Sequence, residues 1–440
     1  MVQKDKLITL ISKNAAGLSG NVSVPGDKSI SHRSLMFGGI AEGETTIVGL
    51  LESEDVKATR AALAACGAVF YMDNKGNWRA RGVGDKGLKN PSDPIDLGNS
   101  GTSTRLLIGL FSGFEVECEI IGDASLSKRP MARVTDPLET MGASFEHDGS
   151  ATLPLKLTTT SQLQAITYTL PLASAQVKSA LLLAGLNARG TTTIIENTPT
   201  RDHTETMLRQ FGVNVEVDPK ENSHHISIQG GQALKATKIQ VPGDPSSAAF
   251  PTVAALITQG SEIKLENVLM TPTRNGLYTT LLEMGADIEI ITGKNESADL
   301  IVKSSSLKGI EVPAKRIASM IDECPILFVA AACASGTTTL TGLEELRVKE
   351  SDRLHVMAEG LKACGVELEE GESSLIIHGT GTAPVGGATI DPQLDHRIAM
   401  SFLILGMACE RPITISDGSA IETSFPGFKD VMNTLGAHIS

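Results

Sequence analysis

The sequence feature that most constrains the fold of this 440-residue chain is a motif that occurs six times along it. In each copy an amphipathic helical pattern ends in a glycine and runs directly into a strand-like segment, as in LETMGASFE. A glycine just after the last helical turn is the usual left-handed cap of a helix. The glycines are Gly67, Gly142, Gly212, Gly285, Gly365 and Gly436, separated by 75, 70, 73, 80 and 71 residues. Such regular spacing indicates internal repeats.

Each repeat also contains a second helix that is more apolar than the first. Segments such as SAQVKSALLLAG and DECPILFVAAACASG are apolar on nearly all sides, which is typical of a buried helix. A β-branched strand pattern follows most of these helices, for example at Thr191–Glu196. One repeat therefore consists of a buried helix, a strand, an amphipathic helix, the glycine and a short strand pair, which predicts an α/β fold. The buried helices are expected to begin near Ser29, Thr102, Ala175, Ser246, Glu323 and His396.

The two ends of the chain are expected to complete one repeat together. The sixth repeat stops directly after its glycine and lacks the strand pair that the other five have, and residues 7–24 look like that missing pair. We therefore expect one lobe of residues 26–243 and a second lobe of residues 1–25 plus 244–440. Each lobe would hold three repeats, with a cleft where the chain crosses between them. The crossings are two copies of Val-Pro-Gly-Asp, at Val24–Asp27 and Val241–Asp244.

Charge and composition narrow the class of protein. The formal net charge of −13 argues against nucleic acid as a partner, because binding to phosphate backbones requires a basic surface. No uninterrupted apolar run reaches membrane-spanning length, and the N-terminal segment resembles neither a signal nor a transit peptide. The six cysteines lack a CxxC pair and metal-ligand spacing, which is typical of reduced thiols in a cytosolic protein. We therefore expect a cytoplasmic protein that binds neither nucleic acid nor membranes.

Cationic side chains recur at the starts of the predicted helices. A lysine or arginine there opposes the helix dipole and is mildly unfavourable unless an anion binds. In the first example, Lys28 and Arg33 follow a Pro-Gly turn and accompany the start of an apolar helix. Equivalent cations are Arg105, Arg129, Lys178, Arg201, Arg274, Lys349, Arg353 and Arg397. One such case is explained by ordinary surface charge, but six or more in equivalent places predict a pocket for several anionic groups.

Two acidic residues stand among these cations. Asp322 opens the fifth buried helix, and Glu350 directly follows Lys349. Acids at helix starts are usually caps, and this interpretation accounts for Asp244 and Asp395. A pair of carboxyl groups among cations can divide the work of a general acid and a general base. Asp322 and Glu350 are therefore candidates for these two roles.

Seven motifs, in order along the chain, resemble those of the 5-enolpyruvylshikimate-3-phosphate synthase family. They are GDKSISHRS, LGNSGTSTR, SKRP, SAQVK, RVKESDRL, DHRIAMSF and TSFPGF. Members of that family move the enolpyruvyl group of phosphoenolpyruvate onto shikimate 3-phosphate. The resemblance implies two lobes of three βαβαββ repeats, an inside-out α/β barrel whose helices point their N-termini at the interdomain cleft. It implies no cofactor and no metal.

The resemblance also assigns roles to individual residues where the motifs match. Lys28 would touch both substrates, and Lys349 would bind the shikimate ester. Asp322 would accept the proton of the attacking shikimate hydroxyl, while Glu350 would protonate the enol methylene carbon. The shikimate 3-phosphate side, mainly in the 26–243 lobe, would include Lys28, Ser29, Arg33, Ser174, Ala175 and Gln176, with Arg201 close by. The phosphoenolpyruvate site would include Gly101, Arg129, Arg353 and Arg397.

Four tags further resemble the second class of the family, which is known mostly for weak binding of the phosphonate inhibitor glyphosate. The tags GDKS, SAQxK, RxHxE and N-x5-T-R occur at Gly26–Ser29, Ser174–Lys178, Arg201–Glu205 and Asn267–Arg274. Thr423 stands where the best-studied forms have a lysine, and Leu106 where they have a proline. Some tolerant members carry a methyl group at the position of Gly101, which this chain lacks. We therefore expect partial tolerance, and stronger tolerance in Gly101→Ala.

Two other functions fit parts of this pattern. The enolpyruvyl transferase that acts on UDP-N-acetylglucosamine shares the fold, but it usually carries a cysteine in a loop before its Arg-Pro. Residues 122–130, the corresponding loop, contain none. A non-catalytic repeat scaffold would leave the cations, the acids and the Ser-Ala-Gln run unexplained. We favour the shikimate enzyme, expect a monomer, and expect its lobes to close when anions bridge their cationic faces.

Overall fold

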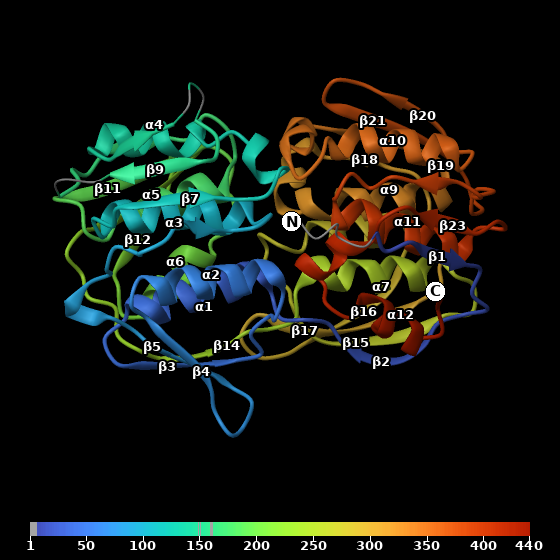
Figure 1. Cartoon of the computed structure of the whole chain (residues 1–440). Coiled ribbons are helices and arrows are strands. Elements are labelled where there is room, and N and C mark those ends of the chain that lie inside the picture. The colour runs from blue at the N-terminus through green and yellow to red at the C-terminus, as the bar shows by residue number, and fades with distance from the viewer. Residues whose placement is uncertain (1–6, 148, 150, 159–161) are drawn as a thin grey trace. The chain divides into compact units, whose positions relative to one another are not determined.

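The computed structural model describes residues 7–147, 149, 151–158 and 162–440 of the chain. These residues form two compact units (Figure 1). The N-terminal unit comprises Gly26–Val241, and the C-terminal unit comprises the residues up to Pro25 together with Pro242–Ser440. The second crossing therefore falls inside the second Val-Pro-Gly-Asp segment, two residues before the position expected from the sequence.

Among the described residues of the N-terminal unit, three four-stranded sheets are combined with six α-helices. The sheets have the strand orders β14-β3-β5-β4, β6-β7-β9-β8 and β10-β11-β13-β12. In each, the first pair is parallel and the other two pairs are antiparallel. The helices are α1 (Lys28–Ile40), α2 (Glu54–Ala65), α3 (Gly101–Gly113), α4 (Ala132–Met141), α5 (Ala175–Gly185) and α6 (His203–Gln210). The strands are β3 (Glu44–Val48), β4 (Val69–Met72), β5 (Trp78–Arg81), β6 (Ile95–Asp96), β7 (Cys118–Ile121), β8 (Ser144–Glu146), β9 (Leu155–Thr158), β10 (Thr167–Thr169), β11 (Thr191–Glu196), β12 (Val215–Pro219), β13 (His224–Gln229) and β14 (Lys238–Gln240).

The C-terminal unit has the same plan. Its sheets have the strand orders β16-β17-β15-β2, β18-β19-β21-β20 and β22-β23-β1-β24. The helices are α7 (Pro245–Ile257), α8 (Gly276–Glu283), α9 (Cys324–Cys333), α10 (Arg353–Ala363), α11 (His396–Ala408) and α12 (Phe428–Thr434). The strands are β1 (Leu10–Lys13), β2 (Ser19–Ser23), β15 (Glu262–Leu269), β16 (Asp287–Thr292), β17 (Ser297–Lys303), β18 (Glu311–Val312), β19 (Ser335–Thr341), β20 (Glu367–Glu370), β21 (Ser374–Thr380), β22 (Thr389–Ile390), β23 (Ile413–Ile415) and β24 (His438–Ile439).

The predicted α/β repeat is confirmed. The helices α1, α3, α5, α7, α9 and α11 each begin within one residue of the position expected for a buried helix. The glycines that follow the six amphipathic helices all have positive φ, for example 107° at Gly142, which caps α4 in the left-handed conformation. A residue with a side chain rarely adopts this conformation, so glycine is required where the chain turns from helix to strand.

Two short strands, β2 and β14, pair outside the repeat to which their sequence position would assign them. In four repeats, the strand that precedes a buried helix pairs in parallel with the strand that follows it, as β6 pairs with β7. β2 precedes α1 but pairs with β15 of the C-terminal unit, and β14 precedes α7 but pairs with β3 of the N-terminal unit. β1 pairs with β23 and β24. Each crossing therefore enters the next unit at the start of a buried helix.

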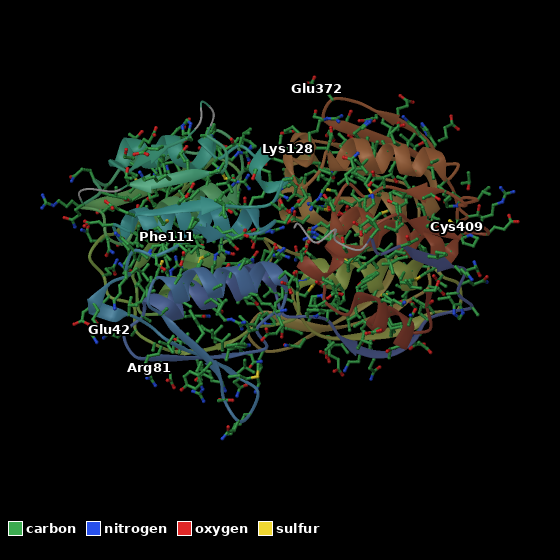
Figure 2. All side chains as sticks on the ribbon, in the orientation of Figure 1. Glu42, Arg81, Phe111, Lys128, Glu372 and Cys409 are labelled. Atoms are coloured by element: carbon green, nitrogen blue, oxygen red, sulfur yellow. The ribbon has the colours of Figure 1, made fainter. Side chains whose placement is uncertain are left out.

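The buried helices form the core of each unit. In the C-terminal unit α7, α9 and α11 contact one another, and Phe250, Phe328 and Phe402 on them are almost fully buried. In the N-terminal unit α3 packs against α5, and Figure 2 shows Phe111 of α3 in the interior of that unit. A Cβ atom at Gly109 would lie 2.2 Å from the Ala180 carbonyl oxygen, so only glycine allows this close helix approach.

Candidate active site

In the C-terminal unit, the guanidinium group of Arg353 lies at the centre of a cluster of acidic side chains. Its side chain is 1% exposed; Nε donates to Asp395 Oδ2 at 2.8 Å, and Nη1 donates to Asp322 Oδ1 at 3.2 Å. Nη2 donates to Glu350 and, at 3.3 Å, to Asp395 Oδ1. Burial disfavours the charged form, but these carboxylates outweigh it and raise the pKa of Arg353. Both predicted catalytic carboxyl groups therefore contact the same buried cation.

Helix starts bring these residues together. Arg353 is the first residue of α10, and Asp395 is the N-cap of α11, where it accepts from the Arg397 N–H at 2.9 Å. Asp322 lies in the 3-10 turn Ile321–Glu323, directly before α9. The N-terminal ends of three helices, which attract anions, thus meet at one group of side chains.

Two further predicted residues complete this cluster. Arg397 Nη1 donates to the main-chain oxygen of Asp322 at 2.9 Å, and Lys349 Nζ lies 4.0 Å from Asp322 Oδ1. Desolvation lowers the pKa of Lys349, and the carboxylates of Asp322 and Glu350 oppose this shift only in part. The Lys349 side chain still keeps 26% of its surface exposed. The charge of a desolvated ammonium group of this kind is stabilised by a bound anion.

In the N-terminal unit, Lys28 stands at the start of α1. Its Nζ forms an ion pair with Asp55 Oδ2 at 2.5 Å, and the two side chains are 17% and 9% exposed. Asp27 caps the helix by accepting from the Ile30 N–H at 2.8 Å. The ammonium group is therefore held beside the positive end of a helix while part of the Lys28 side chain stays accessible.

Arg33 is deeply buried for a predicted substrate ligand, with 4% of its surface exposed. Its Nε donates to Thr204 Oγ1 at 2.7 Å, and its Nη2 donates to Ser179 Oγ at 2.7 Å. Its Nη1 donates to the main-chain oxygen of Ser29 at 3.0 Å. Arg33 therefore connects α1 to α5 and α6, and its contact with substrate stays a prediction.

A second group of predicted residues surrounds Gly101, the first residue of α3. Arg129 Nη2 donates to Asn99 Oδ1 at 2.5 Å, and Arg105 Nη1 donates to Gln176 Oε1 at 2.7 Å. A Cβ atom at Gly101 would lie 3.0 Å from Arg129 Nη1 and 3.3 Å from Arg105 Nη1. The missing side chain therefore allows two guanidinium groups to approach the start of the helix.

The remaining predicted residues lie at the start of α5 and before α6. Ser174 is the N-cap of α5 and accepts from a main-chain N–H of the first turn at 3.4 Å, and Ala175 is the first helical residue. Arg201 follows Thr200, whose main-chain oxygen accepts from Lys178 Nζ of α5 at 3.4 Å. The segment that carries Arg201 therefore lies against α5.

Comparison with protein families decides what kind of protein carries these two groups of residues. The model of the family described as EPSP synthase (3-phosphoshikimate 1-carboxyvinyltransferase) matches residues 13–432. The chain belongs to this family. It is therefore an enzyme that transfers the carboxyvinyl group, also called enolpyruvyl, to 3-phosphoshikimate.

Individual EPSP synthases agree with this assignment over nearly the whole chain. The 3-phosphoshikimate 1-carboxyvinyltransferase of Paramagnetospirillum magneticum is 55% identical over 436 residues, which cover 98% of each chain. That of Chelativorans sp. is 55% identical over 436 residues, 97% of each chain. A solved EPSP synthase structure from Acinetobacter baumannii has a TM-score of 0.85 and 46% identity, covering 98% of this chain and 99% of that one. These matches support the shikimate enzyme over the transferase that acts on UDP-N-acetylglucosamine.

Asp395 is the main residue of this candidate site whose second contact was missed. The cap interpretation is correct but incomplete, because the same carboxylate also pairs with Arg353, 42 residues away in sequence. Nothing in the local sequence indicates that second contact. Not every cation at a helix start lies in the candidate site. Arg274 Nη2 donates to Asp244 Oδ1 at 3.0 Å and lies 3.8 Å from Glu323 Oε1, so carboxylates of the protein itself compensate its positive charge.

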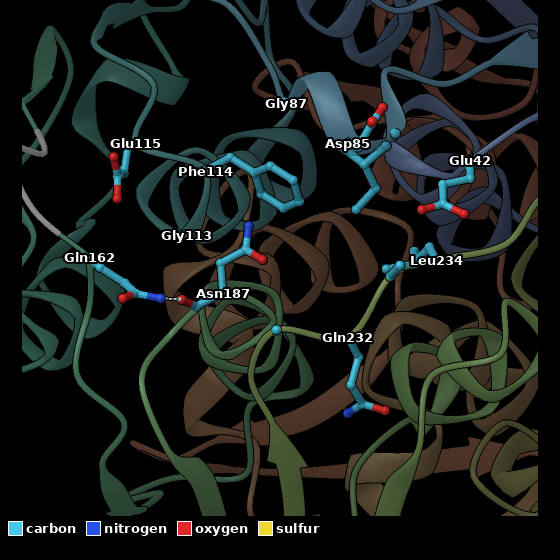
Figure 3. Close-up of a pocket in the computed structure, with 14 residues that line it drawn as sticks. Glu42, Asp85, Gly87, Gly113, Phe114, Glu115, Gln162, Asn187, Gln232 and Leu234 are labelled. Atoms are coloured by element: carbon cyan, nitrogen blue, oxygen red, sulfur yellow. Dashed lines mark hydrogen bonds between the residues drawn. The ribbon is translucent and has the colours of Figure 1, made fainter.

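A pocket of about 440 Å³ lies in the N-terminal unit but is not this site (Figure 3). It is lined by residues at or just past the C-terminal ends of the buried helices, such as Ile40, Gly113 and Asn187. A helix of 13 residues such as α1 is about 20 Å long, so this pocket and the helix starts are at opposite ends of the unit. None of the described residues that line it is among the predicted site residues.

The surface of the C-terminal unit carries a group that could hold a metal ion. Among the described residues, the ligand atoms of His355, Glu359 and Glu370 lie within 4.8 Å of one another. Lys362 and Arg347 already pair with the two carboxylates, at 3.0 and 3.1 Å. Separately, within the part of the chain that the structure describes, no helix has the length and apolar character needed to cross a membrane.

Proposed function

We propose that the residues gathered at the helix starts of the two units carry out the transfer between phosphoenolpyruvate and the 5-hydroxyl of shikimate 3-phosphate. The observation that carries this proposal is the contact of Asp322 and Glu350 with the same buried Arg353. Two carboxyl groups beside one fixed cation, with Lys349 next to them, can serve as a proton acceptor and a proton donor.

The reaction consists of an addition and an elimination. Glu350 gives a proton to the methylene carbon of phosphoenolpyruvate, Asp322 accepts the proton of the 5-hydroxyl, and the hydroxyl oxygen bonds to the neighbouring carbon. In the second step that carbon loses phosphate, and the new methyl group returns a proton, so the double bond forms again. Glu350 takes that proton back and Asp322 passes its own proton to the leaving phosphate, so both carboxyl groups return to their starting state and atoms and charges balance without a cofactor.

The other predicted residues are proposed to bind and orient the substrates. Lys28 touches both substrates, and Lys349 holds the shikimate part. Shikimate 3-phosphate is bound by Ser29, Arg33, Ser174, Ala175, Gln176 and Arg201. Phosphoenolpyruvate is bound by Gly101, Arg129, Arg353 and Arg397. Arginine suits these anions because its planar group donates two parallel hydrogen bonds to a carboxylate or phosphate.

The decisive test is the release of phosphate when the purified protein is mixed with both substrates. We expect phosphate and the enolpyruvyl product in equal amounts, and none when either substrate is omitted. The control replaces shikimate 3-phosphate by UDP-N-acetylglucosamine. Phosphate release with that control, or binding of shikimate 3-phosphate without turnover, would contradict the proposal and favour one of the alternative functions.

We further propose that the enzyme belongs to the second class of the family and is partly tolerant of glyphosate. Support for this class comes from the four tags, while the crowded surroundings of Gly101 bear on the variant Gly101→Ala. A methyl group there would force Arg129 or Arg105 to move by a few tenths of an ångström, because contacts of 3.0 and 3.3 Å are too short for a carbon atom. We expect Gly101→Ala to weaken glyphosate inhibition, measured at fixed phosphoenolpyruvate. Tight inhibition of the wild type, or no loss of inhibition in the variant, would contradict this.

We also place the enzyme in the cytoplasm as a monomer whose two units close on the substrates. Its six cysteines are all free, and five of them are buried, which suits a reducing compartment. Closure predicts a smaller radius of gyration by small-angle scattering when both shikimate 3-phosphate and glyphosate are added. An unchanged scattering curve would argue against closure.

A further inference from the structure

The proposed mechanism leaves unused a buried ion cluster in the N-terminal unit. Lys178, in the first turn of α5, has Nζ 2.7 Å from Glu205 Oε1 and 3.2 Å from Glu196 Oε1. The three side chains are between 0% and 4% exposed. A charged cluster with so little contact with water requires a physical reason, because removing ions from water costs several kcal/mol each.

The cluster holds Thr200 through all three of its polar groups. Lys178 Nζ donates to the main-chain oxygen of Thr200 at 3.4 Å. Glu196, the last residue of β11, accepts with its Oε2 from the Thr200 N–H at 3.2 Å and from the Thr200 hydroxyl at 2.8 Å. The loop from the end of β11 to Thr200 is therefore held by hydrogen bonds within the loop and by one bond to α5.

The same ion cluster also fixes the residues that follow Arg201 in the chain. Glu205 lies in the first turn of α6, so its contact with Lys178 fixes that helix start to α5. The neighbouring Thr204 Oγ1 accepts from Arg33 Nε at 2.7 Å and donates to Ser179 Oγ at 2.8 Å. Between these two anchored parts lies Arg201, which is partly exposed.

Stability alone does not account for Lys178. Buried ion clusters can often be replaced by apolar side chains of similar volume with little loss of stability. An apolar residue at this position would fill the space, but it would supply neither a donor to the Thr200 carbonyl nor a counter-charge to Glu205. The main effect of the lysine is therefore on the position of the segment.

We propose that Lys178 is a positioning residue for Arg201, which it presents to the anionic group of shikimate 3-phosphate. This inference rests on the proposed function, in which Arg201 binds that substrate. Lys178 itself, being fully buried, touches no substrate, and its effect passes through the hydrogen-bonded segment from Glu196 to Glu205.

The first experiment is the variant Lys178→Met, which keeps an unbranched side chain one heavy atom shorter and removes its charge. We expect the Kd of shikimate 3-phosphate, measured by titration calorimetry, to rise by about ten-fold to a hundred-fold, the range for losing a charged hydrogen-bond pair. The KM for phosphoenolpyruvate should change much less. Lys156→Met is the matched control, because it removes an exposed Lys–Glu pair of the same unit, at 3.1 Å, and should leave both values unchanged.

The second experiment is a double-mutant cycle with Arg201→Ala. If Lys178 acts through Arg201, Lys178→Met weakens binding in the wild type but has no further effect in Arg201→Ala. Additive effects would overturn the positioning role, as would an unchanged Kd in Lys178→Met. If Lys178→Met does not fold, Lys178→Met/Glu205→Gln removes one of the two carboxylates left without their counter-charge and serves in the same cycle. Arg201→Ala alone with unchanged Kd would instead contradict the role given to Arg201 under the proposed function.

Discussion

Replacing Asp395 by asparagine tests whether this carboxylate holds Arg353 in place. Asp395 has no exposed surface and accepts from Arg353 Nε at 2.8 Å, Arg353 Nη2 at 3.3 Å, Ser351 Oγ at 3.1 Å and the Arg397 N–H at 2.9 Å. Asparagine keeps one acceptor but turns an NH₂ group toward other donors. Breaking a buried ion pair by removing one partner costs about 3–5 kcal/mol.

For Asp395→Asn we expect a loss of unfolding free energy at the lower end of the range of about 3–5 kcal/mol. Arg353 keeps its contacts with Asp322 and Glu350 in the variant, so part of its charge remains compensated. We therefore expect the free energy of unfolding to fall by about 3 kcal/mol, which is a large share of the 5–15 kcal/mol typical of folded domains. Urea unfolding followed by circular dichroism measures this change. The denaturation midpoint should fall while the slope with denaturant stays the same.

The control for this variant is Asp417→Asn. Asp417 also accepts from main-chain N–H groups at a turn, at 3.0 Å from Ser419 and 3.2 Å from Ile8, but no described contact pairs it with a cation. We expect a loss of at most about 1 kcal/mol there, because only neutral donors are involved. A loss below 1 kcal/mol in Asp395→Asn, equal to that of the control, would refute the view that Arg353 depends on Asp395.

Three further predictions concern catalysis and pH. Glu350→Gln and Asp322→Asn should each lower turnover by about 10²–10⁴-fold while shikimate 3-phosphate still binds, and near-native turnover in either would refute the assigned role. Lys28→Ala should weaken the binding of both substrates and also lower turnover. If calorimetry shows weaker binding of one substrate alone, Lys28 does not contact both. Burial, with help from Lys28 and Arg33, holds the pKa of His32 well below 6.5 in the folded protein. Below pH 6.5 the unfolded chain therefore binds a proton that the folded one does not, and stability falls by up to about 1.4 kcal/mol per pH unit. Urea unfolding at pH 7.5 and 5.5 should show this loss in the wild type and not in His32→Gln; equal losses would exclude His32 as the cause.

The sequence alone determined the repeat and the starts of the buried helices of this protein. The glycine caps and the apolar helices are local signals, since a left-handed cap and a buried helical face each leave a pattern within about fifteen residues. For this reason the starts of the six buried helices could be placed within one residue. The candidate site residues Gly101, Asp322 and Glu350 could also be proposed from the sequence, because they occur in motifs at helix starts.

The tertiary structure decided which strand and which charge pairs with which. β2 pairs with β15, and β14 with β3, although each lies in sequence next to a helix of the other unit. Likewise Asp395 pairs with Arg353, and Lys178 with Glu205, across distances in sequence that no periodic pattern records. A carboxylate at a helix start has the same sequence pattern whether it caps the helix or also neutralises a buried cation. Only the packing of separate helix starts against one another distinguishes these roles, because the energy of an ion pair depends on distance and burial and not on sequence order.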